Sequence, residues 1–463
     1  MEFHDKNVAV LGFAVEGQAM ADLLLARGAR VTVYDDKELS SEVRSPYESQ
    51  SVVFRVAPFG DLTQFDYISR TPGIRLDRAE IVQAKAAGVP IISNTKLFLE
   101  EAKGVVIGVT GTKGKGTTSQ LLFNIISSVR DNVFLGGNIG QSPLKFLQQL
   151  NDHSITILEL SSFQLADVTK SPQLAIVLMV TSEHLDYHKD LNEYIEAKAG
   201  ITKFQTADDT VIYNADYPAS VKIAQQSKGQ KFGVRSQELR KSVGTGLDLS
   251  LRNASTVTNC AVHDGVIVVR LNEVDESIMP VSDIGLVGQH NWENVCAAIM
   301  AAKVLQIDNG HIIQAVKAFK GLEHRLEFVR EVKGVNYYND SISTTPESAI
   351  AAIRAFAQPK ILILGGSSKH SDFTELGKVI RESNSIKAII GIGDEWSNIK
   401  QVIGTTQLKL IESCRTMPEI MAAIQTVVMS GDVVVLSPAC ASFGLFKDYK
   451  DRGQQFKQTV ANL

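Results

Sequence analysis

The sequence predicts an α/β protein of three domains, with Rossmann-like domains at both ends of the chain. The central domain is expected to be a P-loop ATPase-like parallel sheet with a small β region. Short apolar runs alternate with amphipathic helical patterns along 463 residues, as in parallel sheets covered by helices. Glycine-rich turns follow two of these runs, at Gly12–Gly17 and Gly111–Gly116. The chain is also too long for one core, since single cores stop growing at roughly 250–300 residues.

Composition excludes several classes of function. The chain is 44% hydrophobic and 21% charged with a net charge of −4, so neither nucleic acid nor an anionic membrane is an expected partner. Its four cysteines lack metal-binding spacing and are expected to be reduced thiols. The N-terminus has no signal-peptide layout and no apolar run is long enough to cross a membrane. We therefore expect a cytoplasmic chain, and a monomer.

The first domain, expected over residues 1–95, opens like a dinucleotide-binding βαβ unit. Strand Val8–Leu11 leads into the turn Gly12–Gly17, and a second strand ends at Asp35, near the distance expected for an acid that binds ribose. Ala14 replaces the middle glycine, which argues against close contact with a pyrophosphate. A structural Rossmann-like unit, or one that binds another nucleotide, is therefore favoured over an NAD site. Further strands of this domain are expected at Tyr67–Ser69 and Ile91–Ser93.

The strongest motif is Val105–Thr118, an apolar strand followed by a glycine-rich turn, a lysine and hydroxyls that open a helix. Glycines let backbone N–H groups converge on a phosphate, and the helix N-terminus attracts negative charge. Lys115 can reach the β- and γ-phosphates of ATP, and Thr117 or Thr118 can hold Mg²⁺. The first glycine of the strict pattern falls at Val109, so a plain glycine turn is the alternative. The expected ATP contacts are Gly111, Thr112, Lys113, Gly114, Lys115, Gly116 and Thr117.

Polar residues at the ends of neighbouring strands indicate metal binding. Glu159 ends one strand, and His184 lies in a loop after the next, together with Glu183, Asp186 and His188. Carboxylates at the same sheet edge as a phosphate turn suit Mg²⁺, although an exposed strand end or a structural histidine is the alternative. Lys198 lies on an expected helix, where periodicity alone is typical of a surface lysine.

The rest of the chain completes two further domains, expected over residues 96–321 and 322–463. In the central domain Asn294 can pair with adenine, because an amide offers both a donor and an acceptor, while Asn291 can equally be a helix cap. Arg325 can reach phosphates from the domain boundary, and Asp340 can hold a ribose hydroxyl. Loops in the last domain that suit a small anionic substrate are Gly365–Asp372 and Ser437–Ser442. Strands of the two domains are expected at Ile155–Glu159, Ala175–Val180, Val266–Leu271, Val335–Tyr338, Ile361–Leu364, Ala388–Ile392 and Val433–Leu436.

Taken in order, these motifs resemble those of the Mur ligase family, the ATP-dependent amide ligases of peptidoglycan precursor synthesis. The runs that carry the resemblance are GVTGTKGKGTT, LELSSFQL, TSEHLDYH, the helix with Lys198, GQHNWEN, EHR, YNDSIST, GGSSKHSDF and LSPACASFGLFKDY. The resemblance implies that a carboxylate attacks ATP to give an acyl phosphate and ADP. The amine of glutamate then displaces phosphate. The implied substrates are UDP-N-acetylmuramoyl-L-alanine, glutamate and ATP.

The resemblance also implies roles for individual residues. Lys115 would contact the transferred phosphate; Thr117, Glu159 and His184 would serve two magnesium ions. Lys198 would be carbamylated and bind the second ion. The remaining implied contacts are Asp35, Gly73 and Asn138 with the UDP-sugar, Asn294, Arg325 and Asp340 with ATP, and Thr344, Lys369, Ser442 and Tyr449 with glutamate.

Three residues depart from the pattern that the resemblance implies. Gly116 stands where a hydroxyl is usual, which moves the metal contact to Thr117. Ile342 replaces a lysine, and Tyr449 replaces a phenylalanine. The runs around Ile342 resemble a branch in which some members add L-glutamate, so D-glutamate is favoured only as the common substrate. The other readings are a folylpolyglutamate synthase-like ligase, an NAD-dependent oxidoreductase and a non-catalytic regulatory or scaffold protein.

Overall fold

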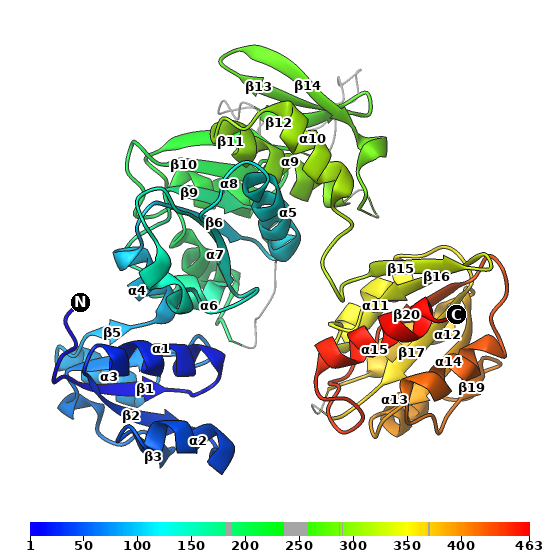
Figure 1. Cartoon of the computed structure of the whole chain (residues 1–463), viewed down its shortest axis with the longest axis horizontal. Helices are drawn as coiled ribbons and strands as arrows, with labels where there is room; N and C mark the ends of the chain where they lie inside the picture. Colours follow the sequence, from blue (N-terminus) through cyan, green and yellow to red (C-terminus); the bar gives the residue numbers. More distant parts are fainter. Residues whose placement is uncertain (182–186, 236–257, 287, 289, 369–370) are drawn as a thin grey trace. The chain divides into compact units, whose positions relative to one another are not determined.

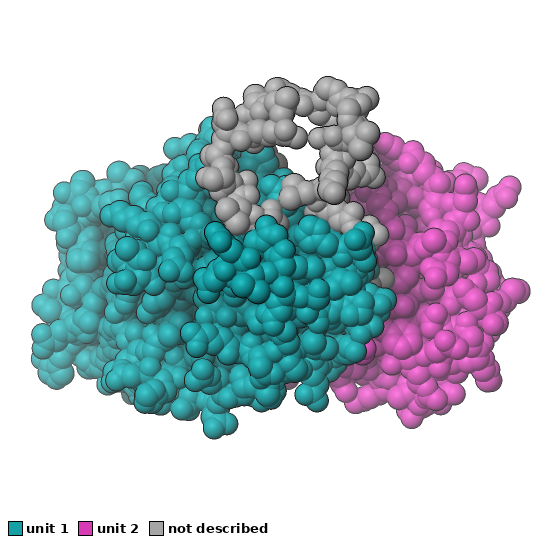
Figure 2. All heavy atoms as spheres, turned by 90° about the horizontal axis from the view of Figure 1, so that it is seen from above, with its two compact units in different colours: residues 1–319 teal, residues 320–463 magenta. Residues whose placement is uncertain are grey.

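A computed structural model describes residues 1–181, 187–235, 258–286, 288, 290–368 and 371–463. The chain divides into two compact units, residues 1–319 and 320–463 (Figure 2). Among the described residues the strands form three sheets, two in the first unit and one in the second (Figure 1). The expected division into domains at residues 95/96 and 321/322 stays a prediction.

The first sheet has the strand order β3-β2-β1-β4-β5, and all its neighbouring strands are parallel. Its order reverses between β1 and β4, which is where doubly wound sheets open a crevice for ligands. The turn after β1 therefore lies beside the loop after β4. Its strands are β1 (Asn7–Leu11), β2 (Arg30–Asp35), β3 (Val53–Val56), β4 (Tyr67–Arg70) and β5 (Ile91–Ile92).

The second sheet has the order β14-β13-β12-β11-β10-β9-β6-β8-β7. The strands from β7 to β12 run parallel, whereas β12, β13 and β14 pair antiparallel and form the small β region. Strand β6 is buried along Val106–Thr110, as expected for a central parallel strand. The strands are β6 (Val105–Thr110), β7 (Val133–Gly137), β8 (Ile155–Glu159), β9 (Leu174–Val177), β10 (Thr210–Asn214), β11 (Gln230–Val234), β12 (Thr258–His263), β13 (Val266–Leu271) and β14 (Val274–Pro280).

Helices cover both sheets of the first unit. Side chains of the two sheets and of their helices join in one hydrophobic core, which runs from Phe3 to Ala224. A buried ion pair adds to it: Arg70 Nε lies 2.9 Å from Asp167 Oδ2. The helices are α1 (Val15–Ala26), α2 (Ser41–Glu48), α3 (Ala79–Ala86), α4 (Asn94–Glu101), α5 (Lys115–Ser127), α6 (Ser162–Leu165), α7 (Leu191–Ala199), α8 (Pro218–Gln225), α9 (His290–Val304) and α10 (Asn309–Ala318).

The second unit is built on a sheet of order β15-β16-β20-β17-β18-β19, in which the pair β15–β16 is antiparallel. One core lies under α11, α12 and α13, and another lies under α14 and α15 on the opposite face. The strands are β15 (Glu327–Val332), β16 (Val335–Asn339), β17 (Lys360–Gly365), β18 (Ile386–Ile392), β19 (Lys409–Ile411) and β20 (Val433–Leu436). The helices are α11 (Pro346–Arg354), α12 (Thr374–Glu382), α13 (Trp396–Ile403), α14 (Met417–Gln425) and α15 (Tyr449–Ala461).

The predicted fold class is confirmed, and each strand expected from an apolar run is present within a few residues. The edge strands β3 and β15 were not among the expected strands: β3 carries the apolar run VFRV but is largely exposed, and charged residues interrupt β15 (EFVREV). Among the residues that the structure describes, none of the helices is long and apolar enough to span a bilayer. The cysteines are thiols as expected, and three of them are buried.

Candidate active site

The phosphate turn joins β6 to α5 at the edge where the parallel strands of the second sheet end. Gly114 caps α5 with φ +86°, a left-handed conformation that favours glycine. The first turn of α5 contains no acidic residue, so the positive end of this helix remains available to an anion. The turn predicted from the sequence is therefore in place.

Lys115 and Lys198 converge on this turn. Lys115 Nζ donates to Gly111 O at 3.0 Å and to Thr112 O at 3.1 Å. Lys198 Nζ donates to the same Gly111 O at 3.0 Å and to Thr110 Oγ1 at 3.4 Å. With both lysines unmodified, two ammonium groups on one carbonyl oxygen make this turn positive, which suits an anion such as a phosphate.

The surface position that periodicity suggests for Lys198 is wrong. Its side chain is 1% exposed, because Asp190 caps α7 and fixes where that helix begins. Helix α7 then places Lys198 one turn after Tyr194, and its Nζ lies 4.6 Å from the centroid of the Tyr194 ring. The pattern of one helix could not show that this face meets the phosphate turn.

Thr112 connects the turn by hydrogen bonds to the segment after β9 and to α7. Its N–H donates to Met179 O at 2.6 Å. Its hydroxyl donates to Thr181 O at 3.0 Å, accepts from Thr181 N at 2.9 Å and lies 3.1 Å from Tyr194 Oη. Thr112 therefore fixes the shape of the turn through protein contacts, while Lys113 is exposed beside it.

Asn294 packs directly on the phosphate turn. A Cβ atom at Gly114 would lie 2.0 Å from Asn294 Oδ1, so glycine is also needed here for space. Asn294 Oδ1 accepts from Thr118 Oγ1 at 3.4 Å, and Asn294 Nδ2 donates to Asn291 Oδ1 at 2.9 Å. The structure thus places Asn294 on the phosphate turn, and its predicted contact with adenine stays a prediction.

Glu159 and Asn138 form a pair at the neighbouring strand ends. Glu159 is buried, with 7% exposure, so the alternative of an exposed strand end does not apply. Asn138 Nδ2 donates to Glu159 Oε1 at 3.1 Å, and Asn138 N donates to Glu159 O at 2.9 Å. Since β8 pairs with β6, this carboxylate lies at the same sheet edge as the phosphate turn.

The donors at this edge fit a magnesium ion. The Glu159 carboxylate and the Thr117 hydroxyl are hard oxygen ligands of the kind that Mg²⁺ prefers. Both belong to neighbouring elements, because β8 ends beside β6 and α5 follows β6. His184, the third expected ligand, lies outside the described residues. His188 is buried nearby, and its Nε2 lies 2.9 Å from Ser162 Oγ.

Asp35 ends β2 and Gly73 follows β4 at the same edge of the first sheet, with β1 between the two strands. Asp35 Oδ2 accepts from Phe13 N at 2.8 Å, and Asp35 Oδ1 accepts from Lys37 N at 3.2 Å. Gly73 is exposed after β4. Glu16, which the sequence reading did not single out, lies in the first turn of α1. Its Oε1 accepts from Gln164 Nε2 at 2.8 Å, and burial raises its pKa.

In the second unit, Asp340 is enclosed by hydroxyl groups. Asp340 Oδ2 accepts from Ser343 Oγ at 2.5 Å and from Ser437 Oγ at 2.7 Å, and Oδ1 accepts from Leu326 N at 3.0 Å. Burial raises the pKa of Asp340 to about 6. In this structure the carboxylate joins the loops after β16 and β20, and its ribose contact stays a prediction.

The structure describes four of the five other site residues expected in this unit. Thr344 is half-buried and Ser442 is buried, whereas Arg325 is exposed at the start of the unit. Tyr449 begins α15, and its carbonyl oxygen accepts from Ser341 Oγ at 2.8 Å. Lys369 lies outside the described residues.

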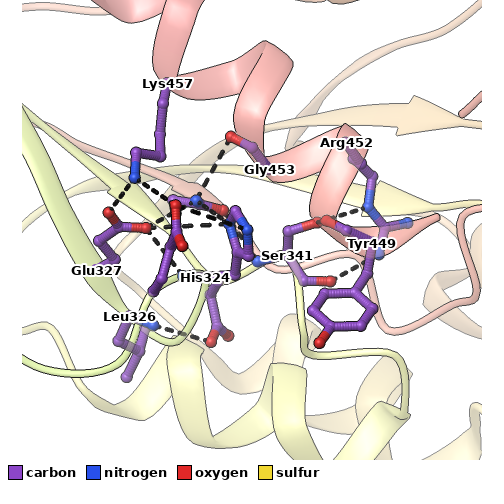
Figure 3. A network of polar contacts seen from close by, with 11 residues as sticks. His324, Leu326, Glu327, Ser341, Tyr449, Arg452, Gly453 and Lys457 are labelled. Carbon is purple, nitrogen blue, oxygen red and sulfur yellow. Dashed lines mark hydrogen bonds and ion pairs between the residues drawn. The ribbon is translucent and has the colours of Figure 1, made fainter. Parts of the chain in front are cut away.

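Arg452 is a residue of this unit for which the sequence predicted no role. It is fully buried, and burial lowers its pKa to about 10. Its guanidinium donates to Ser341 Oγ at 3.0 Å, Ser341 O at 2.8 Å and Cys440 O at 3.3 Å, as Figure 3 shows in part. Arg452 therefore ties the loop with Thr344 to the loop with Ser442.

His324 belongs to a neighbouring polar network (Figure 3). Asn339 Oδ1 accepts from Ser341 N, so its Nδ2 is the donor to His324 Nδ1 at 2.8 Å. His324 Nδ1 therefore carries no proton, which agrees with the lowering of its pKa by burial. His324 could join Glu323 and Glu327 in a metal cluster. However, Lys457 Nζ already lies 2.9 Å and 2.6 Å from the two carboxylates and neutralises them.

Family profiles match three consecutive stretches of the chain. Residues 6–93 match the profile of the Mur ligase MurD-like N-terminal domain. Residues 109–302 match the Mur ligase middle domain, and residues 324–440 match the Mur ligase glutamate ligase domain.

Full-length relatives agree with these profiles. The UDP-N-acetylmuramoylalanine–D-glutamate ligase of Acetivibrio thermocellus is 34% identical, with 99% of this chain and 97% of the relative covered. The enzyme of the same name from Acidobacterium capsulatum is 36% identical at the same coverage.

Solved structures show the same fold at lower sequence identity. The MurF ligase of Thermotoga maritima in complex with ADP matches with a TM-score of 0.54 at 17% identity, over 100% of this chain and 96% of that one. The UDP-N-acetylmuramate–alanine ligase MurC of the same organism matches with a TM-score of 0.54 at 16% identity, over 99% and 100% of the two chains. On the profiles and the full-length relatives together, the chain belongs to the Mur ligase family.

Proposed function

We propose that this chain joins D-glutamate to UDP-N-acetylmuramoyl-L-alanine with conversion of ATP to ADP and phosphate. The observation that carries the proposal is the phosphate turn, where Lys115 and Lys198 meet on Gly111 O. It occurs in a chain whose full length matches D-glutamate ligases. A folylpolyglutamate synthase-like ligase and an NAD-dependent oxidoreductase do not account for the match to the MurD-like N-terminal domain.

The chemistry proceeds in two steps. The alanine carboxylate attacks the γ-phosphorus of ATP, the bond to the β-phosphate oxygen breaks, and an acyl phosphate and ADP result. The glutamate amine then attacks the acyl carbon, loses a proton, and phosphate leaves with the bonding pair. ATP is needed because a carboxylate oxygen is a poor leaving group and phosphate a good one. The protein supplies positioning and charge neutralisation, with no nucleophilic side chain.

The residues at and beside the turn have separate tasks in this proposal. Lys115 leaves its two carbonyl partners and binds the transferred phosphoryl group, whose charge grows in the transition state. The N–H groups at the start of α5 receive the adjoining phosphates. Asn138 holds the Glu159 carboxylate in place and contacts the UDP-sugar.

Two magnesium ions belong to the proposal. When bound, they neutralise phosphate oxygens as the charge redistributes. Thr117 and Glu159 would hold one ion, and His184 with a carbamylated Lys198 would hold the other. Carbamylation is favoured by position: two ammonium groups on Gly111 O repel each other, and a carbamate on Lys198 replaces that repulsion with attraction to Lys115.

Glutamate would bind in the second unit, where Thr344, Lys369, Ser442 and Tyr449 are the proposed contacts, with Arg325 and Asp340 reaching ATP. Arg452 supports this site because it ties together the loops of Thr344 and Ser442. Ile342 is 39% exposed on one of them, where a lysine is usual. This substitution removes a charge, and it is the observation that keeps L-glutamate as the second candidate.

We also propose that the chain is a cytoplasmic monomer of three domains, divided at residues 95/96 and 321/322. Three sheets and three consecutive family profiles support this division.

The test is ADP release from ATP and Mg²⁺ with UDP-N-acetylmuramoyl-L-alanine, in parallel reactions with D-glutamate, L-glutamate or neither. We expect sustained release with D-glutamate and only background release without an amino acid. Sustained release with L-glutamate alone would replace the D-specific proposal by the second candidate. Release that depends on neither amino acid would overturn the ligase proposal.

A further inference from the structure

Hydrogen bonds and a cation–π contact join the loop after β4 to Tyr187. Arg75 pairs with Asp77 through Nε and Nη2, at 2.9 Å and 2.8 Å. Its Nη1 donates to Tyr187 O, and its Cζ lies 5.1 Å from the centroid of the Tyr187 ring. The Tyr187 hydroxyl in turn donates to Pro72 O at 3.3 Å and to Ile74 O at 3.5 Å. These contacts surround Gly73, a proposed contact of the UDP-sugar.

A continuous row of rings runs inward from Tyr187. Its ring centroid lies 4.3 Å from that of Phe163, and Phe163 stacks on His188 at 5.5 Å with an interplanar angle of 8°. The His188 ring then meets Tyr194 edge-on at 5.4 Å. We call Arg75, Tyr187, Phe163, His188 and Tyr194 the aromatic bridge.

The inner end of the aromatic bridge is part of the ATP site. Tyr194 is 1% exposed, and its hydroxyl lies 3.1 Å from Thr112 Oγ1. Lys198 Nζ lies 4.6 Å from the centroid of the same ring. One set of touching side chains thus connects the loop at Gly73 with the turn that holds Gly111.

We propose that the aromatic bridge couples binding of the UDP-sugar at the Gly73 loop to binding of ATP at the phosphate turn. His188 and Tyr194 are buried and Phe163 and Tyr187 are half-buried, and rings packed in contact in this way cannot shift independently. A ligand that orders one end therefore lowers the cost of ordering the other. Arg75 and Tyr187 act as positioning residues. The inference rests on the proposed function for the identity of the two ligands.

The position of the bridge makes the coupling separable from folding. Arg70 and Asp167 join the two sheets more deeply, with Arg70 fully buried and its guanidinium also bound to Phe163 O at 2.8 Å. The side chain of Arg75 is 35% exposed. Changes at Arg75 and Tyr187 therefore remove the link while the deeper ion pair and the shared core remain.

The test measures the dissociation constant of a non-hydrolysable ATP analogue with Mg²⁺, with and without saturating UDP-N-acetylmuramoyl-L-alanine. In the wild type, the UDP-sugar should tighten nucleotide binding by about fivefold or more, as in typical coupled sites. In Tyr187→Ala and in Arg75→Met this ratio should fall to near one. Nucleotide affinity without the UDP-sugar should change by less than about twofold, since neither side chain touches the turn. Tyr187→Phe keeps the ring contacts and should keep an intermediate ratio.

Tyr67→Ala is the matched control, because Tyr67, on β4, packs on Phe3 with ring centroids 5.2 Å apart and lies outside the bridge. It should keep the wild-type ratio. A wild-type ratio in Tyr187→Ala, or an equal loss in Tyr67→Ala, would overturn the coupling. If Tyr187→Ala does not fold, the ratios in Arg75→Met and Tyr187→Phe test the coupling, and wild-type ratios in both would overturn it. A ratio of one in the wild type, with ligase activity intact, refutes only the coupling. Failure of the UDP-sugar to bind refutes the proposed function as well.

Discussion

Two turns of the first unit share one local architecture and differ in charge. The turn between β1 and α1 and the turn between β6 and α5 both follow a buried parallel strand, and neither helix has a side-chain N-cap. In α1 the first turn contains Glu16, and Asp35 occupies the N–H of Phe13. In α5 the first turn has no acid, and Lys115 and Lys198 converge before it.

This difference shows that a strand–glycine turn–helix unit does not by itself make a phosphate site. The first turn of α5 has no acidic residue to compete for its positive end, although Glu159 lies at the same sheet edge. Helix α1 already has a carboxylate in its first turn, which disfavours a pyrophosphate there. The hypothesis of an NAD-dependent oxidoreductase rests on the turn Gly12–Gly17, and it loses its main support for this reason. The UDP-sugar proposed for this sheet must bind with Asp35 and Glu16 in place.

The largest expected effect is at Lys115. Lys115→Ala should lower kcat by about 10²–10³-fold or more, because it removes a fixed charge from the developing transition state. Acyl-phosphate formation, measured as ADP released in a single turnover, should fall with it. Lys170→Ala, an exposed lysine, should behave as wild type. Near-normal acyl-phosphate formation in Lys115→Ala would mean that this turn is not the phosphoryl-transfer site.

Glycine at the α5 N-cap can be tested against a glycine of the same conformation. Gly114 and Gly88 both have φ +86°, but a Cβ at Gly88 would meet nothing within 4 Å. Gly88→Ala should cost about 1–2 kcal/mol of unfolding free energy, from the left-handed backbone alone. Gly114→Ala should cost more and should weaken ATP binding roughly tenfold, since Asn294 must move. Equal losses in thermal unfolding, with unchanged ATP affinity, would argue against the Asn294 contact.

The substitution Asp35→Asn tests the role of the turn between β1 and α1. Asp35→Asn replaces one carboxylate oxygen with an NH2 group, which cannot accept a hydrogen bond from a backbone N–H. It should raise the KM for the UDP-sugar by about fivefold, in line with a partly lost charged hydrogen bond. The KM for ATP should stay unchanged, because the phosphate turn lies on the other sheet. A rise in the KM for ATP of the same size would erase the distinction between the two turns.

The smallest effect concerns the pH dependence of stability at Glu16. Because burial raises the pKa of Glu16, the folded chain keeps this proton at a higher pH than the unfolded chain does. This carboxyl therefore lowers the free energy of unfolding as pH rises from its ordinary pKa to its raised one, and the loss persists above that range. Glu16→Gln should remove this contribution, which urea unfolding from pH 4 to pH 8 can measure. If the free energy of unfolding depends on pH in the same way in the wild type and in Glu16→Gln, the burial of this carboxyl would be contradicted.

Local patterns predicted most of the fold and the phosphate turn. The alternation of apolar runs and amphipathic helices located the central strands, since parallel strands such as β6 and β17 are buried along their length. Gly114 and Lys115 were identifiable because glycine, lysine and hydroxyl must follow one another at fixed positions. The edge strand β15 escaped because it is partly exposed and charged residues interrupt its apolar ones (EFVREV).

Side chains that act over long sequence separations could not be predicted from such patterns. Lys198 reaches Gly111 across 87 positions, Arg70 reaches Asp167 across 97, and Arg452 reaches Ser341 across 111. Each looks like an ordinary surface residue on its own helix or strand. Resemblance to a family identified Lys198, but Arg70 and Arg452 fall outside the motifs quoted for it, and only the fold reveals what they hold.

The comparison of the two turns is tested most directly by hydrogen exchange at their backbone amides. Addition of ATP with Mg²⁺ should slow exchange in Gly111–Thr118 and leave Gly12–Gly17 nearly unchanged, because α5 has no acidic residue in its first turn whereas α1 has Glu16 there. UDP-N-acetylmuramoyl-L-alanine should slow exchange in Gly12–Gly17. Protection of Gly12–Gly17 by ATP, with none at Gly111–Thr118, would contradict the assignment of the ATP site.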